Sequence, residues 1–360
     1  MDPDRRRAWV EVDLGALKRN AATMAARAGV PIVPMVKADA YGLGAAAVVR
    51  ALETLSPWGY GVATVTEGEE LRAMGIDRHI LVVSPLLEWD FATARAARLT
   101  PVLSDVAAIA AWERTGGGPW HLGIDTGMHR AGVPWWQVEQ VVPMLRAHPP
   151  EGACTHFHSA ERDDGTRELQ EQRFRAAISA LPIRPRFLHA ENSPGIERQS
   201  PSPWDLARPG VFLYGVGGDT GSDATPRPVV QLKGRIVSLR DVPAGETVSY
   251  GGTFHAHDAR RVATVSLGYA DGYRRAFSNR GVALVHGRRV PIAGLVTMDM
   301  TMLDVTDVEC RLGDVATFIG CDGEDTLDVN EVARTADMSP YEVLTGLRQR
   351  LPRVYVERDA

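Results

Sequence analysis

The sequence predicts an α/β fold, in which an N-terminal (βα)8 barrel is followed by a mostly β C-terminal domain. Between residues 32 and about 214, short apolar segments alternate with helical patterns, and eight of these segments can be counted as strands. A glycine-rich stretch at residues 215–223 then leads into short alternating strands with few helices. Eight strands favour a closed barrel of the TIM type over an open doubly wound sheet, and the Gly-x-Gly-x-x-Gly turn of dinucleotide-binding open sheets is absent. We therefore expect two domains, residues 1–225 and 226–360.

The barrel elements follow one another in a regular order. Strands are expected at residues 32–36, 60–63, 80–83, 100–103, 120–124, 152–157, 186–189 and 207–214. Helices are expected at about residues 44–55, 67–74, 89–98, 105–113, 135–147 and 166–180. Before them, residues 10–12 are extended, and Asp13 is the expected N-cap of a helix that ends near Arg27. Barrel enzymes carry their chemistry at the carboxyl ends of the strands, and at or near such ends lie Lys37, Asp125, His156, His189 and Arg208.

The second domain is predicted from a change of period after the glycine-rich stretch. Strands are expected at residues 230–239, 262–267, 282–285, 290–293, 301–305, 315–319 and 353–356, and short helices at residues 329–336 and 340–349. We see no internal repeat and no low-complexity segment.

Composition excludes several classes of function. The net charge is −5, and the one basic run, Arg5-Arg6-Arg7, suits a solvated tail, so nucleic acid is not an expected partner. We find no run of ~18 apolar residues and no signal-peptide pattern, so we expect a cytoplasmic protein that does not enter a membrane. Cys154, Cys310 and Cys321 are too few and too irregularly spaced for a disulfide framework or a Cys-x-x-Cys metal site.

Lys37 is the residue around which a function can be built. The chain has only three lysines, and Lys37 ends the apolar run at residues 32–36. An amine can lose its proton where a guanidinium cannot, so a lysine kept at a strand end suggests chemistry. A surface lysine is the simpler alternative, but Tyr41-Gly42-Leu43-Gly44 follows at once, with glycines where the chain must turn into a helix.

One stretch resembles the cofactor segment of the alanine racemase family: Met35-Val36-Lys37-Ala38-Asp39-Ala40-Tyr41-Gly42-Leu43-Gly44. The family pattern is a strand followed by Val-x-Lys-Ala-Asp/Asn-Ala-Tyr-Gly-x-Gly. The resemblance implies that Lys37 binds pyridoxal 5′-phosphate (PLP) covalently and that Tyr41 lies at the cofactor.

The segment His121 to Arg130 resembles the family's Asp-Thr-Gly-Met-x-Arg segment. The resemblance implies that Arg130 contacts the cofactor ring oxygen and the substrate carboxylate. Many members carry a carbamylated lysine two residues before the aspartate, which orients this arginine. Gly123 occupies that position here, so another acidic group, an anion or water must hold Arg130.

Three further barrel segments resemble family motifs. Thr155-His156-Phe157 resembles Thr-His-Phe, and His189-Ala190-Glu191-Asn192-Ser193 resembles His-x-x-Asn-Ser, which implies that Asn192 and Ser193 lie at the phosphate. Arg208-Pro209-Gly210-Val211 resembles the segment whose arginine faces the pyridine nitrogen, while the backbone of Gly210 and Val211 binds phosphate. A permanent cation there keeps the ring nitrogen unprotonated and so discourages side reactions.

The second domain also carries family-like motifs. Val248-Ser249-Tyr250-Gly251 and Gly268-Tyr269-Ala270-Asp271-Gly272 resemble Ser-Tyr-Gly and Gly-Tyr-Ala-Asp-Gly, and Thr297-Met298-Asp299-Met300 resembles a Met-Asp turn in which cysteine is common at the first position. Tyr341 matches a phosphate-side tyrosine. The resemblance implies substrate-binding roles for Tyr269 and Met298. Singly, each tyrosine could be a packing residue; their order after a lysine-bearing barrel favours a site.

By this resemblance the expected activity is the interconversion of L- and D-alanine, a small amino-acid substrate, for peptidoglycan precursors. Racemisation needs one proton-transfer group on each face of a planar carbanion, and the implied pair is Lys37 and Tyr250. In the family the tyrosine comes from the neighbouring subunit, so we expect a homodimer with shared active sites.

Several alternatives stay open. A racemase that prefers serine or accepts a broader range would share all these residues. A PLP-carrier protein would resemble only the barrel half. A PLP-dependent lyase or aldolase acting on D-amino acids would need a metal in the second domain, where His255-Ala256-His257-Asp258 is the one hint. A metal held by His156, His158, Glu161 and His189 would leave Lys37 and Ser193 unexplained, so we expect no metal.

Overall fold

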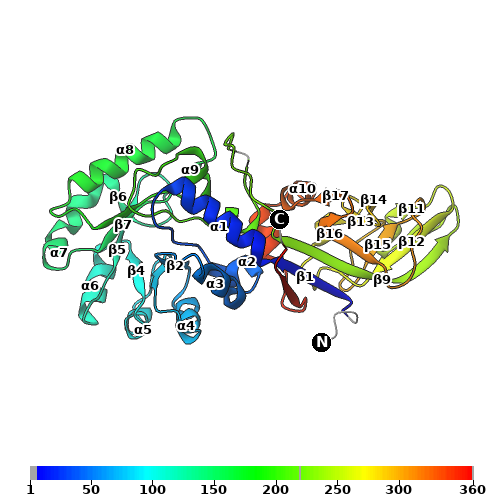
Figure 1. The fold of residues 1–360 in the computed structure, drawn as a ribbon, viewed down its shortest axis with the longest axis horizontal. Coiled ribbons are helices and arrows are strands. Elements are labelled where there is room, and N and C mark those ends of the chain that lie inside the picture. Colours follow the sequence, from blue (N-terminus) through cyan, green and yellow to red (C-terminus); the bar gives the residue numbers. More distant parts are fainter. Residues whose placement is uncertain (1–5, 219, 359–360) are drawn as a thin grey trace. The chain divides into compact units, whose positions relative to one another are not determined.

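The computed structural model describes residues 6–218 and 220–358 (Figure 1). The chain divides into two compact units, which are described separately. The barrel unit comprises Leu17–Ala40 and Ala45–Arg227, and the β unit comprises Pro228–Ala360 with Tyr41–Gly44 and the residues up to Ala16. The domain limits expected from the sequence, residues 1–225 and 226–360, stay a prediction.

The barrel unit is built on a parallel sheet surrounded by helices (Figure 1). Its strands are β2 (Gly59–Val62), β3 (His79–Val82), β4 (Thr100–Leu103), β5 (His121–Asp125), β7 (Gly152–Cys154) and β8 (Phe187–His189), paired in this order, with β6 (Val133–Pro134) beside β5. The helices along this part of the chain are α1 (Leu14–Ala28), α3 (Ala45–Glu53), α4 (Val65–Ala73), α5 (Asp90–Ala96), α6 (Val106–Arg114), α7 (Val142–Ala147), α8 (Thr166–Ser179) and α9 (Ser193–Arg198). Each strand lies within a few residues of its predicted range.

Two irregular segments close the sheet into a ring. Residues 31–36 and 205–209 form single parallel bridges rather than ladders, between Ile32 and Ala207 and between Met35 and Gly61. The amide of Val33 donates to the carbonyl of Ala207 at 2.8 Å. Prolines at 31, 34 and 209 have no N–H to donate, which explains why no regular strand forms there. The predicted barrel of eight parallel segments is therefore confirmed, although its first and last segments are not regular strands.

Two predicted elements of the barrel unit were wrong in kind. Residues 211–214, expected to continue a strand, form the 3₁₀ helix η3 (Val211–Tyr214). The helix expected over residues 135–147 is divided into η2 (Trp135–Val141) and α7, which has a proline in its first turn. Pro143 cannot donate to the preceding turn, so a continuous α-helix is interrupted there. Helix α9 was not predicted, although its Asn192 cap and Pro194 were start signals.

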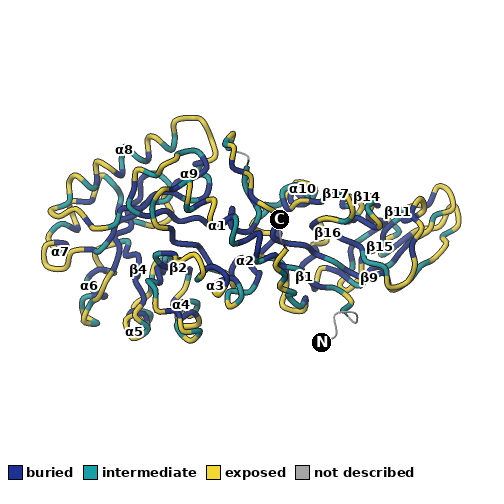
Figure 2. Tube along the Cα trace, viewed as in Figure 1, coloured by how far each residue is buried: buried dark blue, intermediate teal, exposed yellow. Residues whose placement is uncertain are grey.

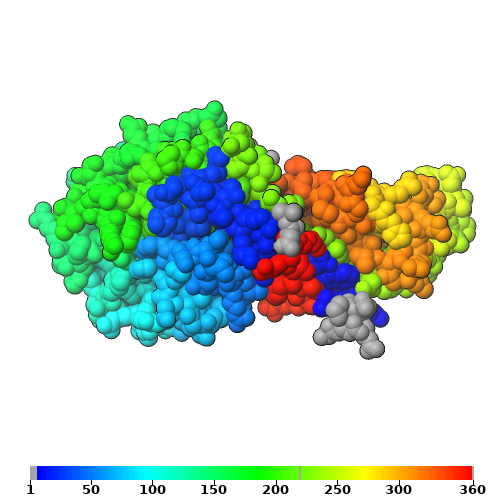
Figure 3. Space-filling model, in the orientation of Figure 1, coloured from blue at the N-terminus to red at the C-terminus, as the bar shows by residue number. Residues whose placement is uncertain are grey.

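The strands of the barrel unit are buried, and most of the buried side chains in this unit are apolar (Figure 2). All residues of β2, β4 and β5 are buried, as expected for parallel strands with helices outside. One core cluster joins Val33, Leu81 and Leu206 and is covered by Trp58 and Phe187. On the face shown in Figure 3, side chains fill the spaces between the outer helices of this unit.

The β unit contains a nine-stranded sheet, whose main path runs β14-β13-β16-β9-β1-β18. The strands are β1 (Ala8–Asp13), β9 (Val230–Val242), β12 (Arg260–Val265), β13 (Val282–Val285), β14 (Arg288–Pro291), β15 (Thr301–Asp304), β16 (Val315–Asp322), β17 (Asp325–Leu327) and β18 (Arg353–Val356). A separate hairpin pairs β10 (Thr247–Val248) with β11 (Phe254–His255), and the helices are η4 (Tyr250–Gly252), η5 (Arg275–Phe277), α10 (Val329–Thr335) and α11 (Pro340–Thr345). The mostly β character expected after residue 226 is confirmed.

The extended segment predicted before Asp13 is strand β1 of the β unit. It pairs antiparallel with β9 and parallel with β18, so strands from both ends of the chain meet in one sheet. Asp13 caps α1 as predicted, because its carboxylate accepts from the amide of Ala16 at 2.9 Å.

Candidate active site

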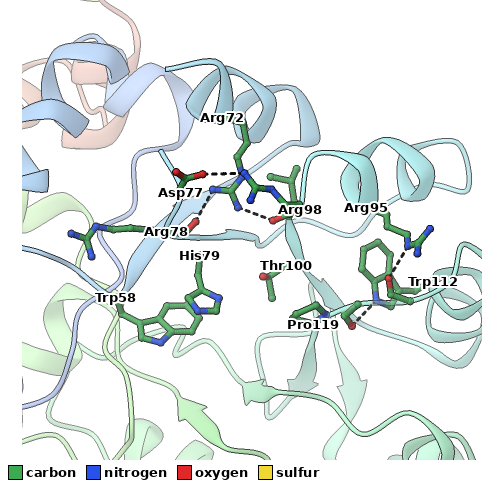
Figure 4. Close-up of a pocket in the computed structure, with 13 residues that line it drawn as sticks. Trp58, Arg72, Asp77, Arg78, His79, Arg95, Arg98, Thr100, Trp112 and Pro119 are labelled. Atoms are coloured by element: carbon green, nitrogen blue, oxygen red, sulfur yellow. Dashed lines mark hydrogen bonds and ion pairs between the residues drawn. The ribbon is translucent and has the colours of Figure 1, made fainter. Parts of the chain in front are cut away.

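A cavity of about 700 Å³ lies at the amino-terminal ends of β3 and β4, where none of the predicted site residues lines it (Figure 4). Its arginines already serve the fold. Arg72 donates to the carbonyls of Ala97, Ile76, Arg78 and Arg98, which end helical turns. Arg78 pairs with Glu53 at 2.8 Å, and Arg98 pairs with Asp77 at 3.0 Å. We therefore seek the active site at the opposite, carboxyl ends of the strands.

Arg208 lies at the centre of the predicted site and is buried. Its two terminal nitrogens donate to four acceptors: His189 Nδ1 at 2.6 Å, His189 O at 2.8 Å, Thr155 O at 2.7 Å and Ala190 O at 3.0 Å. Among the described residues, the Nε–H is its one donor without a partner. A guanidinium held in this way has one N–H left for a ligand acceptor, such as a pyridine nitrogen.

His189 and His121 extend this network into the barrel. Because Arg208 donates to Nδ1 of His189, the ring proton of His189 lies on Nε2, which is 2.7 Å from Nδ1 of His121. Burial, together with the charge of Arg208, holds the pKa of His189 well below its ordinary value. Burial and the neighbouring His79 and Arg208 lower the pKa of His121 to about 3. Both rings are therefore neutral at neutral pH. Burial lowers the pKa of Arg208, but a guanidinium is basic enough to stay charged there.

Lys37, Arg130 and His156 are three further basic side chains near Arg208, and the charges of the group affect one another. Burial lowers the pKa of Lys37, and the charges of Arg130 and Arg208 lower it further, against an opposing effect of Glu67. Burial and the charges of Arg208, Arg130 and Lys37 lower the pKa of His156 to about 3. The mutual effects show that these groups lie close together. The arrangement attracts an anionic ligand and favours the neutral, nucleophilic form of Lys37 relative to an exposed lysine.

Lys37 begins α2 (Lys37–Gly42), a turn with unusual backbone geometry. The φ angles are +53° at Ala38, Asp39 and Ala40 and +57° at Tyr41, so this helical turn is left-handed. The sequence analysis expected the chain to turn at the glycines, but the turn begins before Gly42. Contacts from outside hold it in place, because Glu67 accepts from the amide of Ala38 and Asp39 accepts from that of Ala45, both at 2.7 Å.

Ser193 and η3 form a candidate phosphate site. The Oγ atom of Ser193 accepts from the amides of Gly210 at 2.8 Å and Phe212 at 3.3 Å, so its own hydrogen is free to point outward. The amide of Val211 makes no hydrogen bond among the described residues. Asn192 caps α9 by accepting from the amide of Gly195 at 3.1 Å. A hydroxyl and a backbone N–H that face one place can bind phosphate oxygens, so these residues fit PLP.

Arg130 extends from a turn fixed by Asp125. The carboxylate of Asp125 accepts from the amides of Gly127 at 2.9 Å and His129 at 3.1 Å. The described residues give the Arg130 side chain no hydrogen-bond partner. Gly123 has no side chain to hold Arg130, and a Cβ added there would lie 3.1 Å from Val102 Cγ1 and 3.4 Å from Leu103 O.

The β unit carries the remaining predicted site residues. Tyr41 and Tyr341 lie with ring centroids 6.1 Å apart, and burial beside Tyr341 raises the pKa of Tyr41. Tyr250 and Met298 are 74% and 53% exposed, and Tyr269 is also exposed. These side chains lie on the surface of the unit and do not form an enclosed site within it.

Arg350 holds two of the β-unit turns together. It binds Asp271, in the turn after Tyr269, through both carboxylate oxygens at 2.7 and 2.9 Å. Its other nitrogen lies 2.7 Å from Asp299, in the turn of Met298. One arginine thus fixes the relative positions of two predicted substrate-binding turns.

The structure gathers nine of the predicted residues in the barrel unit: Lys37, Arg130, His156, His189, Asn192, Ser193, Arg208, Gly210 and Val211. The other five, Tyr41, Tyr250, Tyr269, Met298 and Tyr341, belong to the β unit. The roles assigned to these residues stay predictions. The sequence analysis missed Glu67, His121 and Gln170 as supports. The pattern Thr64-x-x-Glu67, which is the capping box of α4, could have found the first.

Metal and membrane sites were searched as well. Among the residues that the structure describes, no three His, Cys, Asp or Glu side chains are grouped so that they could hold a metal ion. His158, proposed as one ligand in the alternative metal site, bonds Ser159 Oγ at 2.7 Å. No helix in the described ranges is long and apolar enough to cross a membrane.

The fold defines a class, the enzymes in which a barrel with a lysine at its strand ends is followed by a separate, mostly β domain. The model for the N-terminal domain of alanine racemases matches residues 12–217, and the model for their C-terminal domain matches residues 229–355. The chain belongs to the alanine racemase family. The predicted family and fold class are thereby confirmed.

Individual relatives agree with the family models. The alanine racemase of Sorangium cellulosum is 39% identical over 345 residues, covering 90% of this chain and 91% of the relative. That of Geobacter sulfurreducens is 37% identical and covers 98% of both chains.

Solved structures show the same architecture. The alanine racemase of E. faecalis has a TM-score of 0.92 at 29% identity and covers 98% of both chains. That of Bartonella henselae, with covalently bound pyridoxal phosphate, has a TM-score of 0.91 at 27% identity and covers 98% of this chain and 100% of that one.

Proposed function

We propose that this chain is a PLP-dependent alanine racemase that interconverts L- and D-alanine with Lys37 and Tyr250 as its two bases. One observation carries the proposal: the lysine that matches the family's cofactor lysine has a lowered pKa and lies beside Arg130, Arg208 and His156. A solved family member from Bartonella henselae carries PLP covalently, and one from Bacillus anthracis has bound L-Ala-P.

The barrel unit offers a binding group for each part of PLP. Lys37 would hold the cofactor covalently until the substrate amine displaces it, the Nε–H of Arg208 would donate to the pyridine nitrogen, and Ser193 with the amide of Val211 would bind the phosphate. Arg208 cannot give its proton away, since a guanidinium stays charged, so the ring nitrogen stays unprotonated. When bound, PLP withdraws electron density from Cα and so makes the Cα proton acidic.

Lys37 serves one face of the substrate. Its lowered pKa makes the neutral amine available to accept the Cα proton, while Arg130 binds the carboxylate of the substrate. A single base would tend to return the proton to the face from which it came, so a second group is required opposite Lys37.

Tyr250 serves the other face, from a second copy of the chain. Its side chain is 74% exposed and is therefore accessible to another subunit. The active assembly is therefore a homodimer with two shared sites.

The enzyme acts in the cytoplasm, where free L-alanine and PLP are both found, and its D-alanine supplies peptidoglycan precursors. We assign alanine as the preferred substrate because the relatives are named alanine racemases. A serine-preferring or broader racemase would use the same residues.

The test is a racemisation assay with PLP-loaded protein on single L-amino acids, with L-alanine and L-serine compared first. We expect L-alanine to be the faster substrate, and borohydride reduction to fix the cofactor on the peptide that contains Lys37. Loss of L-alanine racemisation in a loaded enzyme, or trapping at Lys18 or Lys233 instead, would contradict the proposal.

A further inference from the structure

Gln170 of α8 is a buried amide for which the reaction described so far has no use. It is 1% exposed, and its hydrogen-bonding groups are engaged. Nε2 donates to Thr126 Oγ1 and to the carbonyl of His156, each at 3.1 Å, and Oε1 accepts from the amide of His158 at 3.1 Å. One side chain thus binds both the segment after β7 and the segment after β5.

The first set of contacts fixes the backbone that carries His156. Three consecutive carbonyls are each held by a side chain: that of Thr155 by Arg208 at 2.7 Å, that of His156 by Gln170, and that of Phe157 by Asn192 at 3.4 Å. Two of these three donors are predicted cofactor-binding residues. Gln170 is the third member of the same series, and it approaches from the helix side.

The second contact fixes the turn that carries Arg130. Thr126 Oγ1 accepts from Gln170 Nε2 and also shares a hydrogen bond with Thr155 Oγ1, 2.7 Å away. Arg173 of the same helix donates to the carbonyl of Thr126 at 2.9 Å. The turn at residues 125–130 is thus tied to α8 and to the segment after β7.

We propose that Gln170 is a positioning residue for racemisation: by its hydrogen bonds it fixes the segment of His156 and the turn of Arg130 relative to each other. Its importance in this chain follows from Gly123. Because the described residues give the Arg130 side chain no hydrogen-bond partner, the position of Arg130 depends on the backbone turn that Gln170 and Thr126 hold. The proposal rests on the proposed function.

The chemistry of the site requires an amide at this position. Two acceptors, His156 O and Thr126 Oγ1, face Nε2, and one donor, the amide of His158, faces Oε1. A carboxylate of the same shape has no hydrogen to donate and would face the carbonyl of His156. Gln170→Glu therefore keeps the packing and removes two donated hydrogen bonds, while Gln170→Met keeps the length and removes all three.

The experiment compares these two variants as PLP-loaded enzymes with Gln231→Glu, the same change at a buried glutamine of β9. We measure cofactor absorbance, kcat and KM for both alanine enantiomers, and deuterium isotope effects with each enantiomer deuterated at Cα. A misplacement of about 1 Å costs about 100-fold in rate, so we expect kcat to fall by roughly that factor in Gln170→Glu at retained cofactor absorbance.

The isotope effects distinguish positioning from folding. If the His156 segment and the Arg130 turn are displaced relative to each other, proton transfer at Cα slows, so the isotope effect rises for at least one enantiomer. Gln231→Glu should lower the melting temperature and leave both isotope effects at the parental values. Parental kcat and isotope effects in loaded Gln170→Met would overturn the proposal.

A second variant covers the case in which Gln170 variants fail to fold. Thr126→Val removes only the hydroxyl link, and we expect about a tenfold rise in KM for alanine because Arg130 loses its register. Thr126→Ser, which keeps the hydroxyl, should restore the parental KM. An unchanged KM in Thr126→Val would overturn the proposal. If the parental enzyme does not racemise alanine, the proposed function is wrong. If the parental enzyme racemises alanine and the variants have the same kinetic constants, only this inference is wrong.

Discussion

The two units differ in how completely their candidate site residues are surrounded by the chain's own atoms. In the barrel unit, Arg208 is 7% exposed and His189 is fully buried, and both are hydrogen-bonded without any ligand. In the β unit, Tyr250 is 74% exposed and Tyr269 and Met298 lie on the surface. The barrel unit therefore holds a preorganised site, whereas the β unit presents groups that need a covering surface. This difference supports the proposed sharing of active sites between subunits.

The supports of the two sites differ in the same sense. Gln170 is buried and neutral and joins two turns of the barrel unit, while the half-exposed, charged Arg350 joins two turns of the β unit. Removing a partner of a buried amide destabilises the folded state, because the group left behind is unsatisfied. A charged group of an exposed ion pair can bind water when its partner is removed. The barrel site should therefore be rigid and sensitive to substitution, and the β-unit turns more tolerant.

The largest expected effect tests whether the exposed half works on another chain. Lys37→Ala and Tyr250→Phe should each lower kcat by about 10⁴-fold, because each removes one of two required bases. Refolding the two variants together gives mixed dimers with one intact site, so about a quarter of the parental activity should return. The measurement is racemase activity against mixing ratio, with each variant refolded alone as the control. If mixing restores nothing, Tyr250 does not act in trans.

The next effect tests the preorganisation of the barrel site. Arg208→Lys keeps the charge, but an ammonium cannot reach the four acceptors that the guanidinium binds, so we expect a loss of about 3 kcal/mol in the free energy of unfolding. Urea denaturation measures it. Arg311→Lys, at a side chain that is 90% exposed, is the matched control and should change nothing. A stable Arg208→Lys protein would show that this network contributes little to the fold.

A pH effect is expected from Glu191, which lies between His189 and the phosphate segment. Burial, reinforced by Glu171 and opposed by Ser202, Arg167 and Arg208, raises its pKa to about 7. The folded state then binds a proton that the unfolded state has lost, so the free energy of unfolding falls as the pH rises from about 4.5 to 7.

Glu191→Gln should remove this fall in the free energy of unfolding. At pH 8 the free energy of unfolding of the variant should exceed that of the parent by roughly 1–3 kcal/mol. Denaturation at pH 5 and pH 8 gives the comparison, and Glu139→Gln, at an exposed position, keeps Glu191 and should retain the parental pH dependence with no gain in stability at pH 8. Equal stability of parent and variant at pH 8 would mean that the carboxylate finds a favourable environment when ionised.

The smallest effect concerns the exposed support. Arg350→Ala removes a partly exposed ion pair, so the free energy of unfolding should fall by only about 1 kcal/mol. The KM for alanine should rise more clearly, because the turns of Tyr269 and Met298 lose their common partner. Arg289→Ala removes a similar pair with Asp325 far along the same sheet from these turns, and its KM should stay parental. A parental KM in Arg350→Ala would separate these turns from substrate binding.

The sequence predicted the barrel, the β domain and the family, because these depend on periodicity and on short contiguous motifs. Lys37 and Arg208 could be assigned for the same reason, since each stands in its own motif at a strand end. Local geometry was harder, because the prolines at 34 and 209 turn expected strands into single bridges. Gln170 could not be found, because its partners Thr126 and His156 are distant in sequence and meet only when β5, β7 and α8 pack together.

The left-handed turn at Lys37 has a consequence for redesign of this enzyme. Each non-glycine residue in that conformation costs about 1–2 kcal/mol, and four of them follow one another from Ala38 to Tyr41. A β-branched residue would add a steric penalty at each position, so Ala38 and Ala40 are poor places to diversify in a mutant library. Variation aimed at new amino-acid substrates is better directed to the surface turns of Tyr269 and Met298, where the backbone bears no such load.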